Sequence, residues 1–257
     1  MTIAASRNLS RVLTVAAVVP LLAIASCKKA QNDATTSTPS VAAPATPPAG
    51  QQWSDVIVPT NEGGLVMGNP NAPVKVVEYG SLSCPHCAKL SQDGMEKIAG
   101  TYVKSGKVSY EFRSFAIHPQ DIQLTMLVRC APTPAASFGL VEQLFANYDP
   151  LIKILEANAT KVQAVQSQPM PQRLITTSNL LGYTDFFSAR GLSVEAQNKC
   201  LADTASATKV AKESEAISGK GIESTPTVFI NGNKQTSTEW TEIDSAIAKA
   251  VAAGGAA

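Results

Sequence analysis

Residues 74–87 read VKVVEYGSLSCPHC, and this stretch decides the fold of the chain. Its first six residues are a valine-rich run that predicts a strand, and the glycine and serines after them predict a loop. Pro85 suits the first turn of a helix, and apolar residues then recur at helical spacing until Gly106 follows the end of the pattern. The CPHC motif therefore lies at a strand-to-helix junction, with Cys84 at the helix N-terminus.

A thiolate is stabilised at this position, because unpaired backbone N–H groups and the helix dipole favour negative charge there. We therefore expect the pKa of Cys84 to be lowered, and His86 adds to this effect if it is protonated or donates a hydrogen bond. A stable thiolate is a good leaving group and stabilises the reduced form, which makes the disulfide an oxidant. Cys84 is the predicted nucleophile, and Cys87, one turn along, is the predicted resolving thiol.

Two other interpretations of CPHC are a structural disulfide and one half of a metal site. Zinc usually requires a second pair of cysteine or histidine ligands at ligand spacing. The other histidine, His118, is expected in a loop after a strand over residues 108–115, and Cys130 and Cys200 are far apart in the sequence. The motif and its strand-to-helix context favour redox chemistry and no metal.

Residues 225–232 read TPTVFING and predict a second part of the same sheet. Thr227 to Ile230 is the predicted strand, and Asn231-Gly232 is a strong hairpin signal. Pro226 stands at the start of the strand, where its missing N–H is tolerated.

A CPHC motif after a strand, a Thr-Pro pair before a late strand and a helical stretch between them resemble the DsbA-like thiol–disulfide oxidoreductases. The resemblance implies an α/β fold, namely a thioredoxin-like fold with an inserted all-helical domain. It also implies that the Thr225–Pro226 bond is cis and shapes a substrate groove, in which Thr225 offers backbone hydrogen bonds to an extended peptide. An ordinary trans proline at a strand start is the alternative.

Glu78 matches the acidic residue that this family carries six places before its first cysteine. The resemblance implies a buried acid that relays protons to Cys87, and burial would raise the pKa of Glu78 towards neutrality, as this role requires. The alternative is that Glu78 faces solvent from its strand.

The roughly 100 residues between His118 and Gly221 predict a helical region, since they contain no alternation that demands strands. Five prolines divide it into several helices: Pro132, Pro134, Pro150, Pro169 and Pro171. The spacing of Cys200, Val210 and Ile217 predicts one long amphipathic helix near its end. We expect the thioredoxin-like fold over residues 53–117 and 222–253, with the helical insertion over 118–221.

The chain has five cysteines. If Cys27 is modified and the CPHC cysteines pair locally, Cys130 and Cys200 are left to bond to each other, although the sequence permits other pairings. The pattern is similar to a branch of the family with an extra disulfide in the helical domain, which implies a structural disulfide here. A regulatory or electron-relaying role for this pair stays open.

The N-terminus has the layout of a secretory signal over residues 1–26, with Arg7 and Arg11 ahead of an apolar run. Its end, Ile24-Ala25-Ser26-Cys27, resembles a bacterial lipobox, which implies that Cys27 receives lipid and anchors the chain to a membrane. A plain cleaved signal and an uncleaved anchor are the alternatives. Residues 27–52 are rich in alanine, proline, threonine and serine and predict a disordered tether.

The formal net charge of +1 gives no basic excess for nucleic acid and no acidic tail for a basic partner. We expect an extracytoplasmic enzyme, in the periplasm or cell envelope, that donates a disulfide to reduced exported polypeptides and uses no cofactor. The resemblance implies re-oxidation by a quinone-linked membrane partner. A disulfide isomerase or reductase on the same fold is one alternative, and a non-catalytic binding lipoprotein is another.

Overall fold

The computed structural model describes residues 46–254. The predicted signal over residues 1–26, the predicted lipidation site Cys27 and most of the predicted tether over 27–52 lie outside the described residues. Within residues 46–254, no helix combines the length and the apolar character that a membrane crossing requires.

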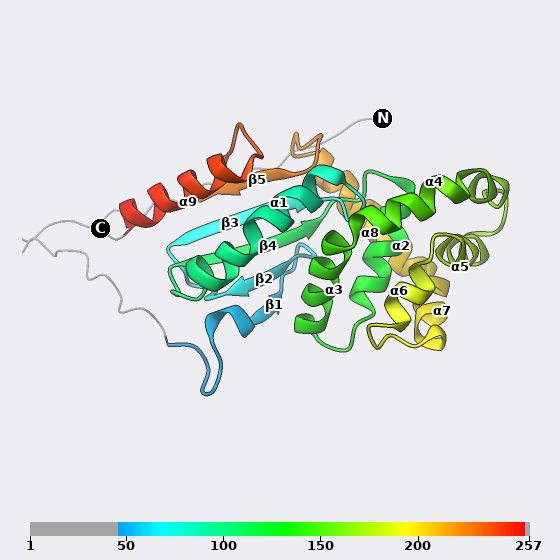
Figure 1. Ribbon diagram of the computed structural model, residues 1–257, viewed down its shortest axis with the longest axis horizontal. Coiled ribbons are helices and arrows are strands. Elements are labelled where there is room, and N and C mark those ends of the chain that lie inside the picture. The colour runs from blue at the N-terminus through cyan, green and yellow to red at the C-terminus, as the bar shows by residue number, and fades with distance from the viewer. Residues whose placement is uncertain (1–45, 255–257) are drawn as a thin grey trace, which may run out of the picture. The chain divides into compact units, whose positions relative to one another are not determined.

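Six strands of the described chain form one sheet in the order β1-β2-β4-β3-β5-β6 (Figure 1). The strands are β1 Ile57–Pro59, β2 Leu65–Gly68, β3 Val74–Gly80, β4 Val108–Ser114, β5 Thr227–Ile230 and β6 Asn233–Lys234. Strands β3 and β4 are parallel, and every other neighbouring pair is antiparallel. The late strand β5 therefore pairs directly with β3, although about 150 residues separate them in the sequence.

The three strands predicted from sequence are confirmed as β3, β4 and β5. The predicted turn is also present, because Asn231 and Gly232 both have positive φ angles and connect β5 to β6. Strands β1 and β2 were not predicted. They have only three and four residues, so they carry little periodic signal.

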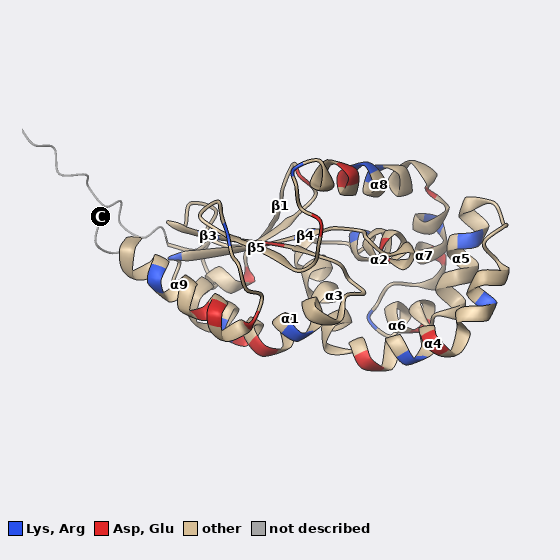
Figure 2. Ribbon diagram, turned by 90° about the horizontal axis from the view of Figure 1, so that it is seen from above, with Lys and Arg blue, Asp and Glu red and all other residues tan. Residues whose placement is uncertain are grey.

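Helices cover both faces of the sheet, and Figure 2 shows α1, α3 and α9 on one side and α8 on the other. The helices are α1 Pro85–Lys97, α2 Pro119–Arg129, α3 Pro134–Ala146, α4 Tyr148–Ala164, α5 Met170–Leu180, α6 Tyr183–Ser188, α7 Val194–Ala202, α8 Thr204–Ser218 and α9 Trp240–Gly254. A π-helical segment, Ile98–Val103, continues α1. The run α2–α8 lies entirely between β4 and β5 in the chain, and the α/β fold class is confirmed.

The two faces of β3 follow the period of two that a strand imposes. Val74, Val76 and Glu78 face the side covered by α1, and the two valines belong to the large apolar core. Tyr79 faces the other side, where it packs in a small cluster with Ile217 of α8. Glu78 is thus a carboxyl group on the buried face that α1 covers.

The predicted long helix through Cys200 and Ile217 is wrong. Two helices, α7 and α8, meet at Asp203, whose side chain accepts hydrogen bonds from the backbone N–H groups of Ala205 and Ser206 at 3.0 and 3.1 Å. These are the bonds of an N-cap, and they start a new helix instead of continuing the old one. The apolar residues keep their helical spacing on both sides of Asp203, so periodicity alone did not reveal the break.

Candidate active site

The CPHC motif begins α1, as predicted. Cys84 has an extended backbone and is the N-cap, Pro85 is the first helical residue, and both cysteines are free thiols. Cys84 is 4% exposed and Cys87 is fully buried, whereas Pro85 and His86 lie at the surface. The motif therefore presents Cys84 as the outer sulfur and Cys87 as the inner one.

The pKa of Cys84 is lowered to about 5. The largest cause is a hydrogen bond from the Cys87 thiol, and the Thr225 side chain and the backbone N–H groups of Cys87 and His86 act in the same direction, while burial opposes them. The helix N-terminus therefore contributes as expected. His86 contributes through its backbone, and its ring is exposed.

Cys87 behaves in the opposite way, because burial raises its pKa well above the ordinary value. Donating its proton to Cys84 and lying near the charge of Glu78 raise this pKa further. Of the two sulfurs, only Cys84 is ionised at neutral pH. This asymmetry is what a nucleophile and a buried partner need for thiol–disulfide exchange.

Glu78 is buried, with 1% of its surface exposed. Burial is the main reason that its pKa is raised to about 7, and the negative charge of Cys84 adds to the rise. A hydrogen bond from the Tyr110 hydroxyl, 2.6 Å from Oε2, opposes it. Glu78 is thus partly protonated near neutral pH, which suits a general acid or base.

The Thr225–Pro226 peptide bond is cis, and its loop lies against Cys84. The Cys84 thiol donates to the Thr225 carbonyl oxygen, with 3.4 Å between sulfur and oxygen. The Thr225 hydroxyl is buried and has no other hydrogen-bond partner among the described residues, so it can turn to the sulfur once that sulfur ionises. The late strand therefore completes the site that the early helix begins.

Asp121 holds the loop before Cys84 in place, and the sequence analysis missed it. This fully buried carboxylate accepts hydrogen bonds from the hydroxyls of Ser81 and Ser83, each at 2.8 Å. Backbone N–H groups of Ser83, Ile117 and His118 also donate to it. Asp121 thus ties the start of α2 to the active-site loop.

A local signal for Asp121 was present in the sequence. It is the third residue of α2, after the cap His118 and Pro119, and its side chain accepts from the cap backbone as in a capping box. His118 lies near the site through this arrangement, with Nδ1 3.2 Å from the Ser81 hydroxyl. The local pattern predicts the cap, but it does not reveal that the same carboxylate binds a loop about 40 residues earlier.

Cys130 and Cys200 form a disulfide, with 6.2 Å between their Cα atoms. Cys130 is the C-cap of α2 and Cys200 lies in α7. Because Cys130 follows Asp121 by nine residues along α2, the disulfide is about 14 Å along the helix from Asp121. The bridge therefore fixes the far end of the helix that holds the active-site loop.

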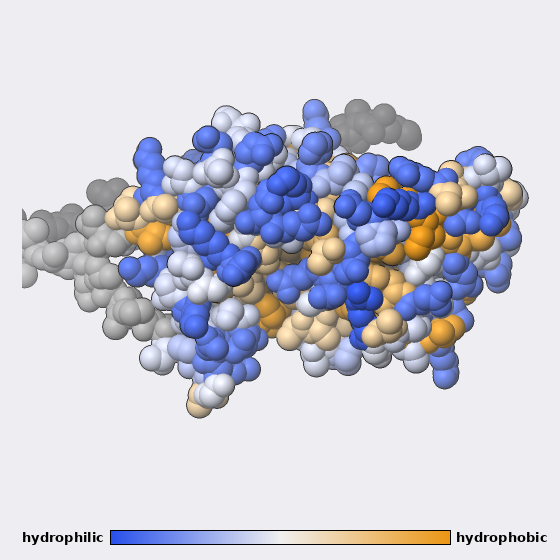
Figure 3. All heavy atoms as spheres, viewed as in Figure 1, coloured by the Kyte–Doolittle hydropathy of each residue, from blue (hydrophilic) through white to orange (hydrophobic). Residues whose placement is uncertain are grey.

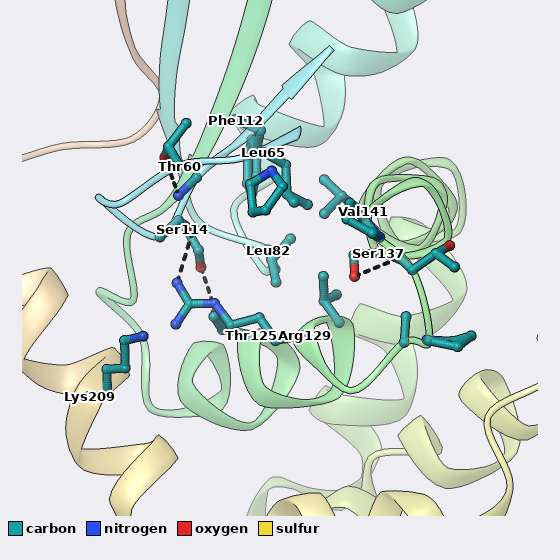
Figure 4. A pocket seen from close by; sticks show the side chains of 18 residues that line it. Thr60, Leu65, Leu82, Phe112, Ser114, Thr125, Arg129, Ser137, Val141 and Lys209 are labelled. Atoms are coloured by element: carbon teal, nitrogen blue, oxygen red, sulfur yellow. Dashed lines mark hydrogen bonds between the residues drawn. The ribbon is translucent and has the colours of Figure 1, made fainter. Parts of the chain in front are cut away.

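Two cavities lie beside this framework. One of about 320 Å³ lies behind the active-site loop, and Figure 4 shows Leu82 projecting into it towards Val141 of α3 and the α2 residues Thr125 and Arg129. The other, of about 750 Å³, lies between α2, α4, α5 and α8. Neither cavity is lined by Cys84 or Cys87.

Helix α4 covers the larger cavity, and none of its residues is fully buried. On the face shown in Figure 3 most side chains are hydrophilic, and apolar ones reach the surface along this helix, where Ile154 is 36% exposed. The helix therefore packs less tightly than α1, which carries the redox motif and contributes fully buried residues to the core.

A family model described as thioredoxin matches residues 60–249, a range that includes the CPHC motif, the cis proline and the helical region between them. The chain belongs to the thioredoxin family. A Rickettsia bellii relative, described as a candidate protein-disulfide oxidoreductase, is 26% identical over 192 residues, which are 74% of this chain. The chain spans 66% of that relative's length, just under two thirds.

Solved structures agree with this membership of the thioredoxin family. A protein-disulfide isomerase from Novosphingobium aromaticivorans is 26% identical, with a TM-score of 0.69 over 74% of this chain and 97% of that protein. The α-DsbA1 protein of Wolbachia pipientis shares the fold, at 23% identity and a TM-score of 0.58 over 74% of this chain and 91% of that one. The thioredoxin-like fold with DsbA-like structural neighbours is therefore confirmed.

Proposed function

We propose that this chain is an extracytoplasmic thiol–disulfide oxidoreductase that donates the Cys84–Cys87 disulfide to reduced cysteines of exported polypeptides. One arrangement carries the proposal: Cys84 caps the N-terminus of α1 beside the Thr225 loop, Cys87 is fully buried behind it, and the pKa values of the two sulfurs are therefore shifted in opposite directions. A low pKa at Cys84 stabilises the reduced form, and a pair whose reduced form is favoured acts as an oxidant.

The reaction begins when a substrate thiolate attacks the sulfur of Cys84 in the oxidised protein. The Cys84–Cys87 bond breaks, a substrate–Cys84 disulfide forms, and Cys87 leaves as a thiolate. A second substrate thiolate then attacks the substrate sulfur, which forms the substrate disulfide and releases Cys84 as a thiolate. Two electrons pass from substrate to protein, and the low pKa of Cys84 makes it the better leaving group in the second step.

Glu78 supplies the proton in this scheme. The leaving Cys87 thiolate has a pKa raised well above the ordinary value, so it must be protonated inside the core. Glu78, with its pKa raised to about 7, holds a proton part of the time at neutral pH and gives it to Cys87. During re-oxidation the ionised Glu78 takes that proton back.

The loop at Thr225 and Pro226 forms the edge of the substrate groove in this proposal. The Thr225 carbonyl oxygen lies 3.4 Å from the reacting sulfur, so an extended substrate that pairs with this backbone is held beside Cys84. Such pairing contacts the backbone of the substrate and depends little on its side chains, which suits a protein that acts on many unfolded substrates.

Export and re-oxidation complete the proposal. The signal over residues 1–26 directs export, lipid on Cys27 tethers the domain, and a quinone-linked membrane partner takes the two electrons from Cys84 and Cys87. Cys130–Cys200 has a structural role. Mass spectrometry of Cys27 in membrane fractions tests the anchor, and an unmodified, soluble chain would contradict it.

Trapping of substrates tests the central proposal. In Cys87→Ser, the Cys84 thiolate can still attack a disulfide of an exported protein, which forms a mixed disulfide and releases one substrate thiolate. Without the Cys87 thiol this mixed disulfide cannot be resolved from within the protein, so exported proteins should accumulate in disulfide linkage to it. Cys84→Ser is the matched control and should trap none. The proposal would be contradicted if Cys87→Ser cells contained no trapped partners and the wild type did not oxidise a reduced test peptide. The chain would then be interpreted as a non-catalytic binding lipoprotein.

A disulfide isomerase or reductase is the second candidate, and the similarity to the Novosphingobium isomerase favours it. The reduction potential, measured by equilibration with glutathione, separates the two. A donor of disulfides should lie near the oxidising values of DsbA-type proteins, roughly −120 mV, whereas a value near −270 mV would indicate a reductase.

A further inference from the structure

Tyr110 and Glu78 lie side by side in the buried face of the sheet. Strands β3 and β4 are parallel, and Tyr110 pairs with Val76, two residues before Glu78. The two side chains therefore share one face. Both are buried, with 3% and 1% of their surface exposed, and the Tyr110 hydroxyl lies 2.6 Å from Oε2 of Glu78.

The two carboxyl oxygens of Glu78 have different surroundings. Oε2 accepts the Tyr110 hydrogen bond, whereas Oε1 is buried and has no hydrogen-bond partner among the described residues. Gly80 makes room for Oε1, since a side chain at that position would lie 2.9 Å from it and would also collide with the Phe112 ring. The carboxyl group thus has one anchored oxygen and one free oxygen.

Tyr110 is itself held in a fixed orientation. Its ring packs edge-on against Phe138 of α3, with 6.1 Å between ring centres and 88° between ring planes. Burial and the nearby charge of Glu78 raise the pKa of Tyr110 well above its ordinary range, so the hydroxyl keeps its proton and acts only as a donor to Oε2. The anchor is therefore present at every pH at which Glu78 titrates.

We propose that Tyr110 is a positioning residue for proton transfer: its hydroxyl fixes Oε2 of Glu78, so that Oε1 is the atom that exchanges a proton with Cys87. The inference rests on the proposed role of Glu78 as the proton carrier. An unfixed carboxyl group can rotate and offer its proton in several directions, whereas an anchored one offers it from a single atom.

The other groups that act electrostatically on this pair come from α1 and α3. Cys84 raises the pKa of Glu78, and Glu78 in turn raises the pKa of Cys87. Glu142 of α3 acts on Tyr110. Tyr110 is the one group among these that favours the ionised form of Glu78 by donating a hydrogen bond to it.

Replacing Tyr110 with phenylalanine keeps the ring in the core and removes only the donor. The ionised form of Glu78 loses its hydrogen bond, so its pKa should rise by about one unit. Resolution of a Cys84–glutathione mixed disulfide by Cys87 requires ionised Glu78, and the pH midpoint of that step should move upward by the same amount.

The experiment reads both quantities in the full chain. Infrared difference spectra of the reduced protein follow the carboxyl C=O band of Glu78 against pH, with Glu78→Gln identifying the band. Stopped-flow mixing with oxidised glutathione gives the pH midpoint of resolution. Tyr102→Phe is the matched control, because it also removes a hydroxyl 2.6 Å from a carboxylate, at Asp244 on α9.

A rise in both midpoints in Tyr110→Phe, with neither moving in Tyr102→Phe, is the expected result. An unchanged Glu78 band in Tyr110→Phe overturns the inference about Tyr110. If the resolution rate in Glu78→Gln follows the wild-type pH profile, the proposed proton role fails instead, while the infrared test of the anchor still stands. Should Tyr110→Phe not fold, 3,5-difluorotyrosine is placed at position 110. Its hydroxyl is a stronger donor, so the pH midpoint of the Glu78 band must then fall.

Discussion

The two cysteine pairs of this protein contain the same atoms and have different surroundings. Cys84 and Cys87 are free thiols at the beginning of α1, where the helix N-terminus and the cis-proline loop stabilise a thiolate. Cys130 and Cys200 are bonded to each other, and Cys130 caps the C-terminus of α2, where the helix dipole disfavours negative charge. Position on the helix, and not residue type, distinguishes the free thiol pair from the bonded one.

Helix α2 connects the two regions physically. Its first turn carries Asp121, which binds the loop before Cys84, and its last residue is followed by Cys130. The comparison therefore predicts that changes at the two pairs have different consequences: loss of chemistry at one and loss of stability at the other.

The largest expected effect is on activity. Cys84→Ser should lower oxidation of a reduced peptide by at least about a thousandfold, because the nucleophile is lost. The double variant Cys130→Ser/Cys200→Ser should stay within a few-fold of wild type. If it were instead as inactive as Cys84→Ser, the second pair would be part of the electron path, and the contrast between the two regions would fail.

The second effect is on stability. The disulfide between Cys130 and Cys200 joins residues 70 apart in the sequence, so its removal should lower the free energy of unfolding by about 4 kcal/mol on the chain-entropy model. Urea denaturation of the double variant against wild type measures this difference. A change close to zero would mean that helix packing alone holds α2 to α7.

The third effect tests the link between the regions. Asp121→Ala leaves five hydrogen-bond donors around a buried position without their acceptor, and should cost about 3 kcal/mol of stability. Asp203→Ala, which removes an exposed helix cap, is the control and should cost about 1 kcal/mol. Equal losses in the two variants would contradict the role of Asp121 as the anchor of the loop.

The smallest effect concerns the second part of the site. Thr225→Val keeps the shape of the side chain and removes the hydroxyl that helps to stabilise the thiolate, so the pKa of Cys84 should rise by about one unit. Thiolate absorbance at 240 nm, recorded against pH, measures the shift. A pKa that stays at the wild-type value would show that backbone and Cys87 contacts are sufficient.

Local sequence patterns predicted the parts of the site that depend on one segment. The strand, loop and helix around CPHC follow from valine-rich spacing, Pro85 and the apolar helix face, and the turn at Asn231-Gly232 follows from its residues. The cis bond at Pro226 and the burial of Glu78 agree with what the family resemblance implied.

Contacts between distant segments were beyond sequence reasoning. Asp121 binds Ser83, and Tyr110 binds Glu78, across separations of 38 and 32 residues. The spacing of apolar residues does not indicate such pairs, because each partner fits the pattern of its own strand or helix. The helix break at Asp203 was not predicted for a related reason, since a cap within an apolar repeat leaves the repeat intact.

The lowered pKa of Cys84 also makes the stability of the dithiol form depend on pH. The folded value of about 5 lies below the ordinary value of about 8.5 for an unfolded chain. Between these two values Cys84 binds fewer protons in the folded state than in the unfolded state, so its contribution to stability rises with pH, whereas Glu78, with its pKa raised to about 7, contributes in the opposite direction. The stabilisation is fully present above about pH 8.5 and is lost as the pH falls through about 5.

The opposite pKa shifts of Cys84 and Cys87 are tested most directly by the rate at which iodoacetamide alkylates the reduced protein. This rate is measured from pH 3 to pH 10 in the wild type and in Cys87→Ala, which isolates the outer sulfur. In the wild type Cys84 should react with a midpoint near pH 5, and Cys87 should remain unmodified. In Cys87→Ala the midpoint should rise, because the largest stabilising hydrogen bond is lost. A wild-type midpoint near 8.5, the value of an ordinary thiol, would contradict the account.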